Sequence, residues 1–206
     1  MSTSNHPYLL NVVLYHHSVL AFGRKSFFNG IINIALGERQ HVVIGEGCMF
    51  SFCIWLRTAD VHLIYDCETK CRINPSRSLF IGDHVWVGQN AMIMKGSQLG
   101  SGCIIGAMAV VAGKKIPSNS SWAGNPARQI KSGIFWEGSS VNRWTADDTK
   151  NHEVYSSDHF IYGPHAPAML TWDEIDQKLT DTHDCGQRLE FIKRILTERD
   201  KNRFAL

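Results

Sequence analysis

The sequence has 206 residues, 44% of them hydrophobic, which suits one soluble domain or one domain with an appendage. The formal net charge is only +2, but it is unevenly distributed: residues 1–131 carry 12 Lys/Arg and 6 Asp/Glu, and residues 132–206 carry 9 and 13. A basic first part suits an anionic ligand, and scattered solvated charge explains the count equally well.

Two further features exclude whole classes of protein. The apolar run from Tyr8 to Phe22 contains Asn11, His16 and His17 and is too short to cross a bilayer, so we expect neither a signal peptide nor a transmembrane segment. The six Cys residues form no paired CxxC motifs, which argues against a zinc ribbon. We therefore expect free thiols, no metal and a cytoplasmic location.

The chain begins with irregular apolar sequence and becomes periodic at Ile44. The stretch from Tyr8 to Leu36 predicts imperfect first coils of a repeat structure, or a cap on its open end. From Ile44 to Ile81 there are 37 residues, which is not a multiple of six. The polar, proline-containing segment from Arg57 to Leu79 is therefore predicted to be a loop inserted at a corner, where repeat proteins often carry function.

From Ile81 to Ile116 the sequence repeats every six residues: IGDHVW, VGQNAM, IMKGSQ, LGSGCI, IGAMAV, VAGKKI. An aliphatic residue opens each block. A helix cannot keep a six-residue row on one face, because it has 3.6 residues per turn. Short strands joined by tight corners can, provided that successive coils bury one another's apolar faces. The pattern predicts a solenoid of parallel β-coils.

Three stretches between Ile81 and Lys131 resemble the hexapeptide-repeat acyltransferases: IGDHVWVG, LGSGCIIGAMAVV and WAGNPARQIK. The resemblance is closest from Thr58 to Lys131 and implies a left-handed parallel β-helix with three hexapeptides per coil. The expected fold class is an all-β solenoid with an inserted loop and an α-helical C-terminal appendage. The expected domains are 1–131, the acyltransferase β-helix with residues 57–79 as an active-site loop, and 132–206, a loop and helical extension.

Two helices are predicted in the extension after a loop-like, aromatic stretch. The first begins at Thr171, because Glu174 three residues later completes a capping box. The second runs from about Gly186 to Arg203. Its apolar stripe is expected to pack on the body or on a neighbouring subunit, and it consists of Leu189, Ile192, Ile195 and Leu196.

Two of the ten His residues lie in the insertion or the regular repeats, and a neutral imidazole is the usual general base near neutral pH. His62 lies in TADVHLIYD, which is similar to the O-acetyltransferases of sialic acid and capsule polysaccharides. That resemblance implies a catalytic His followed 24 residues later by a Trp, and here the residue is Trp86. A loop His without a role is the alternative. His84, at a solenoid corner, is the second candidate base or a surface His.

Neighbouring residues have possible roles beside His62. Asp60 lies two residues earlier, so in an extended segment it projects to the same side and can orient the imidazole. A backbone carbonyl or Asp66 could do the same. Trp86 is expected to form an aromatic wall that aligns the acceptor or the thioester with His62, and coil packing is its alternative.

The resemblance implies acetyl-CoA as the donor, with its pantetheine arm lying along the coils between subunits. Matching positions place Gln89 and Ala107 beside the arm. Lys114, Arg128 and Lys131 match positions near the phosphates, which need cations. Lys115 is a rival to Lys114, because GKK holds one residue more than the family's usual TK. Any one of these cations could instead be a solvated surface side chain.

The predicted function is transfer of acetyl from acetyl-CoA to a sugar hydroxyl of a bacterial surface polysaccharide, with His62 as general base and no covalent intermediate. The expected partners are a carbohydrate acceptor and further copies of the chain in a homotrimer with active sites between subunits, and no nucleic acid. The alternatives are an amino-sugar or xenobiotic acetyltransferase and a non-catalytic β-helix scaffold. A zinc carbonic anhydrase is excluded because no two His residues are five apart.

Overall fold

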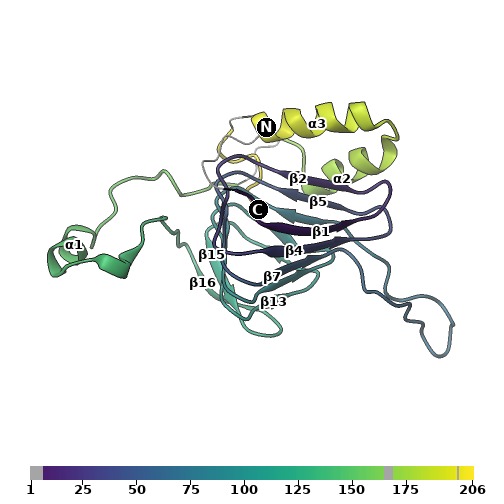
Figure 1. Cartoon of the computed structure of the whole chain (residues 1–206), viewed down its shortest axis with the longest axis horizontal. Helices are drawn as coiled ribbons and strands as arrows, with labels where there is room; N and C mark the ends of the chain where they lie inside the picture. The colour runs from purple at the N-terminus through teal and green to yellow at the C-terminus, as the bar shows by residue number, and fades with distance from the viewer. Residues whose placement is uncertain (1–6, 165–168, 199) are drawn as a thin grey trace.

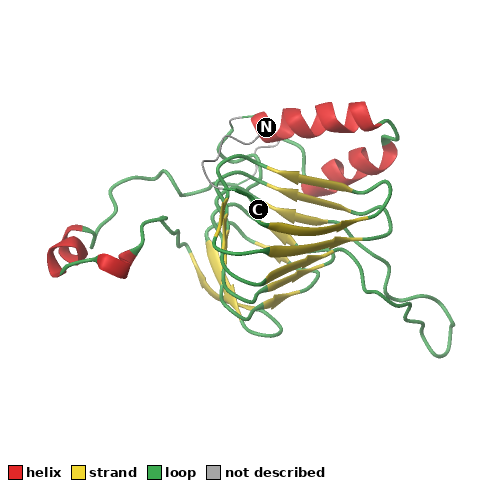
Figure 2. Ribbon diagram, viewed as in Figure 1, coloured by secondary structure: helices red, strands yellow, loops and turns green. Residues whose placement is uncertain are grey.

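The six-residue period folds into a three-sided solenoid (Figures 1 and 2). The computed structural model describes residues 7–164, 169–198 and 200–206. The aliphatic residues that open the blocks all point inward, and none is accessible to solvent; they are Ile81, Val87, Ile93, Leu99, Ile105 and Val111. The predicted solenoid of parallel β-coils is confirmed.

Each face of the solenoid is one sheet, and every coil contributes one strand to each sheet. Sheet A contains β1 (Leu10–Leu14), β4 (Ile32–Leu36), β7 (Ile54–Arg57), β10 (Met92–Met94) and β13 (Val110–Val111). Sheet B contains β2 (Val19–Phe22), β5 (His41–Ile44), β8 (Leu79–Ile81), β11 (Gln98–Leu99) and β14 (Lys115–Ile116). Sheet C contains β3 (Phe27–Phe28), β6 (Met49–Phe50), β9 (Trp86–Val87), β12 (Ile104–Ile105), β15 (Ser120–Ala123) and β16 (Arg128–Ser132). The strands pair in parallel except β15 with β16, where the chain turns back.

The coils differ in length, which explains why the repeat is hard to see before Ile44. In the first coils, residues paired on adjacent strands are 22 positions apart, as for Leu10 and Ile32. In the later coils they are 18 apart, as for Met92 and Val110. The longer coils still place aliphatic residues inward, so the stretch from Tyr8 to Leu36 forms imperfect first coils, as predicted.

The insertion leaves the solenoid at the corner between sheets A and B. β7 ends at Arg57 and β8 begins at Leu79, yet Ile44 still pairs with Ile81 across the 37-residue interval. The Arg77 N–H donates to the Thr58 carbonyl at 3.0 Å, which closes the base of the insertion. Residues 58–78 therefore project without disturbing the register of the coils (Figure 1).

Aromatic rings fill the solenoid core at its N-terminal end. Phe28 stacks on Phe50 with ring centroids 5.3 Å apart, and Tyr8 packs against Phe22 and Phe28 at 5.6 and 4.8 Å. The Tyr8 hydroxyl donates to the Gly23 carbonyl at 3.0 Å. These large side chains fill the wider first coils and cover the end of the core.

Helices α2 (Trp172–Asp181) and α3 (Cys185–Thr197) cover the outer face of sheet B. Trp172 stacks on Phe80 of β8 with centroids 5.0 Å apart. The predicted capping box of α2 is present, with Thr171 and Glu174 bonded reciprocally. The predicted end of the second helix at Arg203 is wrong, because the helix stops at Thr197 and the chain turns back toward the solenoid.

Arg203 fastens this returning segment to the solenoid. Its guanidinium donates two hydrogen bonds of 2.9 Å to the carboxylate of Asp83, and both side chains are buried. Its remaining nitrogen contacts carbonyl oxygens at the end of α3, including that of Leu196. Removing one partner of a charge pair buried this deeply strongly destabilises the protein, because the other charge is left buried without a partner.

Between β16 and α2 the chain extends away from the solenoid. Residues 137–158, here called the projecting segment, contain a 3₁₀ helix, η1 (Val141–Arg143), and the short helix α1 (Ala146–Asn151), neither of which buries a residue. Figure 1 shows this segment on the side of the body opposite the insertion. No helix within the described ranges combines the length and the apolar character needed to cross a membrane.

Burial of His41 under the helices predicts a pH dependence of stability. Burial and the nearby Arg188 lower the pKa of His41 from 6.5 to about 4. Because the unfolded state binds the proton more readily, the free energy of unfolding should decrease by roughly 3 kcal/mol as the pH falls from about 6.5 to 4. Denaturant titrations at several pH values would measure this.

His41→Asn is the matched variant, because an amide oxygen can replace the ring nitrogen that accepts from the Val19 N–H at 3.2 Å. The variant should show a shallower dependence between pH 6.5 and 4. The same slope in both proteins would contradict the assignment.

Candidate functional site

The insertion is an ordered hairpin with a charged anchor at its base. Tyr65 and Arg72 face each other in an antiparallel bridge. The Arg72 guanidinium binds both oxygens of Glu38, on the corner between β4 and β5, at 2.5 and 2.9 Å. Ser76 donates to the same carboxylate. Hydrogen bonds from Arg72 and Ser76 lower the pKa of Glu38 to about 2, so the anchor persists across the physiological pH range.

Asp60 binds Lys95 and Asn74. The Lys95 ammonium lies 2.6 Å from the Asp60 carboxylate, and the Asn74 amide donates to it at 3.1 Å. The hydrogen bond from Lys95 is the main cause of the lowered pKa of Asp60. The expected contact between Asp60 and the His62 ring is absent from the described chain, because the segment bends and Lys95 occupies the carboxylate. The rival Asp66 accepts from its own turn, at Glu68 and Thr69.

His62 is exposed on the insertion, and only its backbone is held. Its carbonyl accepts from the Asn74 amide at 2.8 Å, the same amide nitrogen that donates to Asp60. Among the residues that the structure describes, the His62 ring makes no hydrogen bond. The backbone is therefore positioned, while both ring nitrogens are available to a partner from outside.

Trp86 lies on the outer face of sheet C, with 36% of its surface exposed. It pairs with Met49 on one side and Ile104 on the other, while its neighbour Val87 fills the core. The insertion leaves the corner between sheets A and B, which is the corner opposite sheet C in a three-sided prism (Figure 1). A single chain therefore does not bring His62 and Trp86 together.

His84 lies between two aromatic rings from the C-terminal extension. Trp136 stacks on one face at 3.9 Å and Phe160 on the other at 4.1 Å, both nearly parallel to the imidazole. The ring Nε2 lies 3.0 Å from the Trp136 carbonyl, which can only accept, so Nε2 carries the proton. Burial lowers the pKa of His84. The expected exposed corner His is therefore a packed residue whose ring faces are both covered.

The ring stack continues from His84 to Trp86. Trp136 is buried, its indole N–H donates to the His84 carbonyl at 2.9 Å, and its ring lies 6.0 Å from that of Trp86. Phe160, His84, Trp136 and Trp86 thus form one aromatic ladder, which the sequence analysis missed. The sequence from Phe135 to Tyr162 is rich in aromatic residues, which indicates packing of some kind. That richness does not specify a contact with residue 84.

Gln89 and Ala107 lie together at the corner between sheets C and A. Both are exposed, and the Met108 N–H donates to the Gln89 carbonyl at 2.8 Å. A Cβ atom on Gly88 would lie 2.6 Å from the Ala107 nitrogen, so the coils meet closely here only because residue 88 has no side chain. The backbones of two successive coils are therefore in close contact at this corner.

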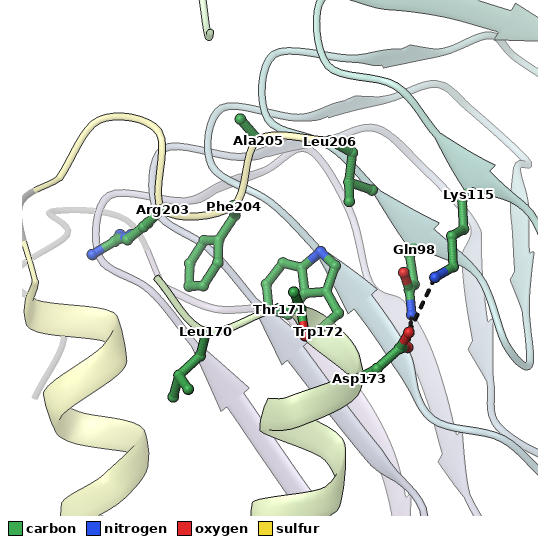
Figure 3. Close-up of a pocket in the computed structure, with 10 residues that line it drawn as sticks. All are labelled: Gln98, Lys115, Leu170, Thr171, Trp172, Asp173, Arg203, Phe204, Ala205 and Leu206. Carbon is green, nitrogen blue, oxygen red and sulfur yellow. Dashed lines mark hydrogen bonds and ion pairs between the residues drawn. The ribbon is translucent and has the colours of Figure 1, made fainter. Parts of the chain in front are cut away.

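The four candidate cations separate into two groups. Lys114 is half-buried, with its ammonium 5.9 Å from the Trp122 ring centroid, and Arg128 and Lys131 are exposed on β16. Lys115 instead points to the outer face of sheet B, where it binds Asp173 at the start of α2 at 3.1 Å (Figure 3). The Lys115 ammonium thus faces the helical extension, and its role as a phosphate ligand stays a prediction.

The cysteines are free, and Cys48 and Cys103 are buried at small-residue positions of the core. Within the described ranges, no three His, Cys, Asp or Glu side chains are grouped so that they could hold a metal ion.

Comparison with known proteins adds to this geometry. The model of the bacterial transferase hexapeptide family (six repeats) matches residues 79–113. The chain is 35% identical over 140 residues to a polysialic acid O-acetyltransferase of Escherichia coli O1:K1, covering 68% of this chain and 45% of that protein. It is 34% identical over 127 residues to a polysialic acid O-acetyltransferase of Neisseria meningitidis, covering 62% and 58%. The chain thus spans about half the length of these curated relatives.

A solved structure extends the similarity to three dimensions. The polysialic acid O-acetyltransferase OatWY superimposes with a TM-score of 0.61 and 31% identity, covering 71% of this chain and 69% of that one. Relatives built from hexapeptide repeats imply that the coils of this solenoid wind left-handed.

The aromatic ladder predicts what Trp136→Ala does. Loss of a buried Trp costs about 3–5 kcal/mol of local packing, so the chain around residue 136 should detach from the solenoid corner. Limited proteolysis should then cut between residues 132 and 137 at least tenfold faster than in the unmodified protein, since a tenfold change corresponds to about 1.4 kcal/mol.

Trp144→Ala is the control, because the Trp144 ring contacts His152 within the projecting segment, with centroids 4.4 Å apart. It should leave the solenoid corner intact. Equal cleavage of both variants would show that Trp136 does not hold the extension.

Proposed function

This chain belongs to the hexapeptide-repeat acyltransferase family, and from that premise we propose that it transfers an acetyl group from acetyl-CoA to a hydroxyl of a surface polysaccharide. The observation that carries the proposal is His62, an exposed imidazole on an anchored hairpin whose ring makes no hydrogen bond within the described chain. The names of the relatives, which act on polysialic acid, support a carbohydrate acceptor.

The proposed reaction is direct transfer within a ternary complex. One neutral ring nitrogen of His62 takes the proton of the sugar hydroxyl as its oxygen attacks the thioester carbonyl. The tetrahedral intermediate then collapses, the C–S bond breaks, and the CoA thiolate leaves and recovers the proton from the imidazolium. Asp60 acts as a positioning residue, because Asn74 links its carboxylate to the His62 backbone.

The complete site requires a second chain. Trp86 is proposed to come from the neighbouring subunit of a homotrimer and to form a wall beside His62. The outer faces of two sheets support this assembly, since helices cover sheet B while Trp55 on sheet A and Trp86 on sheet C are exposed. Apolar faces at an angle to each other suit a closed ring in which sheet A of one copy meets sheet C of the next.

The donor is proposed to lie along the corner between sheets C and A. Gln89 and Ala107 would contact the pantetheine arm there, while Lys114, Arg128 and Lys131 at the C-terminal end of the solenoid would bind the phosphates. Residues 1–131 would thus form the catalytic domain, with residues 57–79 as its active-site loop, and residues 132–206 would form the extension.

Removing the proposed base tests the mechanism. His62→Ala should lower kcat for acetyl transfer by about 10²–10⁴-fold, the usual contribution of a general base. Release of free CoA, measured with a panel of sialic acids, hexoses and capsule fragments, would report the loss. CoA affinity and the unfolding midpoint should change little.

His84→Ala is the comparison for this variant. It removes the other candidate imidazole, and it should weaken attachment of the extension more than the chemistry. Activity that survives His62→Ala and disappears in His84→Ala would overturn the assignment.

Mixing two inactive variants tests the composite site. Trimers reassembled from equal amounts of His62→Ala and Trp86→Ala chains contain some sites in which both residues are intact. With random mixing, about one quarter of all sites are intact in this way. Activity should therefore return on mixing, although each variant alone is inactive. A mixture that remains as inactive as its components would place the two residues in one subunit.

A further inference from the structure

A cavity of about 410 Å³ lies where the C-terminal extension meets the corner between sheets B and C. Lys25, Glu46 and His84 line it from the solenoid, and His159, Tyr162 and Lys201 line it from the extension. Its volume falls within the range of small-molecule sites. None of its residues belongs to the proposed catalytic pair or donor site.

Some polar groups around this cavity already have partners, since Asp83 binds Arg203 and the Lys201 ammonium donates to the Asp158 carbonyl at 2.6 Å, while others have none. The Lys25 ammonium, the His159 ring and the Tyr162 hydroxyl make no hydrogen bond among the described residues, and the Glu46 carboxylate is 3.9 Å from Arg203, beyond hydrogen-bond distance. Burial raises the pKa of Tyr162, so its hydroxyl stays protonated and can both donate and accept. The cavity therefore offers donors and acceptors side by side.

The charges of the lining favour an uncharged ligand. Among the described residues, three cationic and four carboxylate side chains line the cavity, so neither an anion nor a cation is strongly preferred. A molecule with many hydroxyl groups uses such a lining fully, because each hydroxyl donates to a carboxylate and accepts from an ammonium. Sugar rings have this chemistry.

The cavity also adjoins the proposed acceptor wall. His84 lines it from the turn that precedes β9, and Trp86 is the first residue of that strand. Trp136 bridges the two, since its ring contacts both His84 at 3.9 Å and Trp86 at 6.0 Å. The cavity and Trp86 therefore lie at neighbouring positions of one aromatic ladder.

We propose that this cavity is a second subsite, which binds an uncharged, hydroxyl-bearing sugar unit of the acceptor next to the unit that is acetylated. The inference rests on the proposed function for its link to catalysis, whereas binding itself does not depend on it. It also gives the C-terminal extension a role, because seven of the twelve lining residues come from that part of the chain.

Direct binding is the first test. Maltotriose, cellotriose and mannotriose would be titrated against the full chain without acetyl-CoA and followed by saturation-transfer NMR and calorimetry. At least one should bind, and a Glu46→Gln, Tyr162→Phe double variant should bind it at least tenfold more weakly, with an unchanged unfolding midpoint. Both substitutions keep side-chain shape, and the Tyr162 ring retains its packing against Gly102.

Arg143→Gln on the projecting segment and His62→Ala are the controls, and both should bind the trisaccharide normally. Absence of binding by all three neutral trisaccharides would overturn the subsite. A second outcome would also overturn it: a sialic acid trimer that binds as tightly as the neutral trisaccharide, or more tightly, and whose binding the double variant weakens equally. The site would then select an anion.

Kinetics separate this inference from the proposed function. In the double variant KM for a trisaccharide acceptor should rise at least tenfold, while kcat/KM for the matching monosaccharide stays unchanged. An equal change for both acceptors would refute a second subsite while leaving acetyl transfer established. Trisaccharide binding without any acetyl transfer would instead refute the proposed function and leave the subsite in place.

Discussion

The whole molecule depends on inward-pointing side chains that stack in register from coil to coil. Ile81 pairs with Leu99, which pairs with Ile116, and all three are completely buried. No coil can bury this row alone, so each coil is stable only between its neighbours. The result is a prism whose corners hold chain segments at fixed positions, and the proposed catalytic and binding residues lie on or beside those corners.

The sequence predicted the features that follow from this stacking. The 37-residue interval from Ile44 to Ile81 located the insertion, because the inward row must resume where it stopped. The capping box at Thr171 located α2 for a local reason, since both partners lie within one helical turn. By contrast, Trp136 and Phe160 reach His84 across 52 and 76 positions of sequence, and periodicity contains no information about such contacts.

Local spacing does not predict contacts that distant residues decide. Asp60 was expected to face His62 because i and i+2 align in an extended segment, yet Lys95, 35 residues away, binds the carboxylate. Lys115 is an alternative phosphate ligand because it follows Lys114, yet alternate residues of β14 face opposite sides, and Lys115 faces the side where α2 supplies Asp173 as its partner. The extension thus provides a contact that the repeat alone does not predict.

The unbroken register across the insertion has a practical consequence. Because Ile44 and Ile81 pair as if residues 58–78 were absent, the solenoid tolerates a change in the length or content of that hairpin, provided that its two ends still meet at Thr58 and Arg77. The hairpin can therefore be exchanged for another, in evolution or by design. Such an exchange would alter the chemistry at one edge of the solenoid while the strand pairing of its coils is kept.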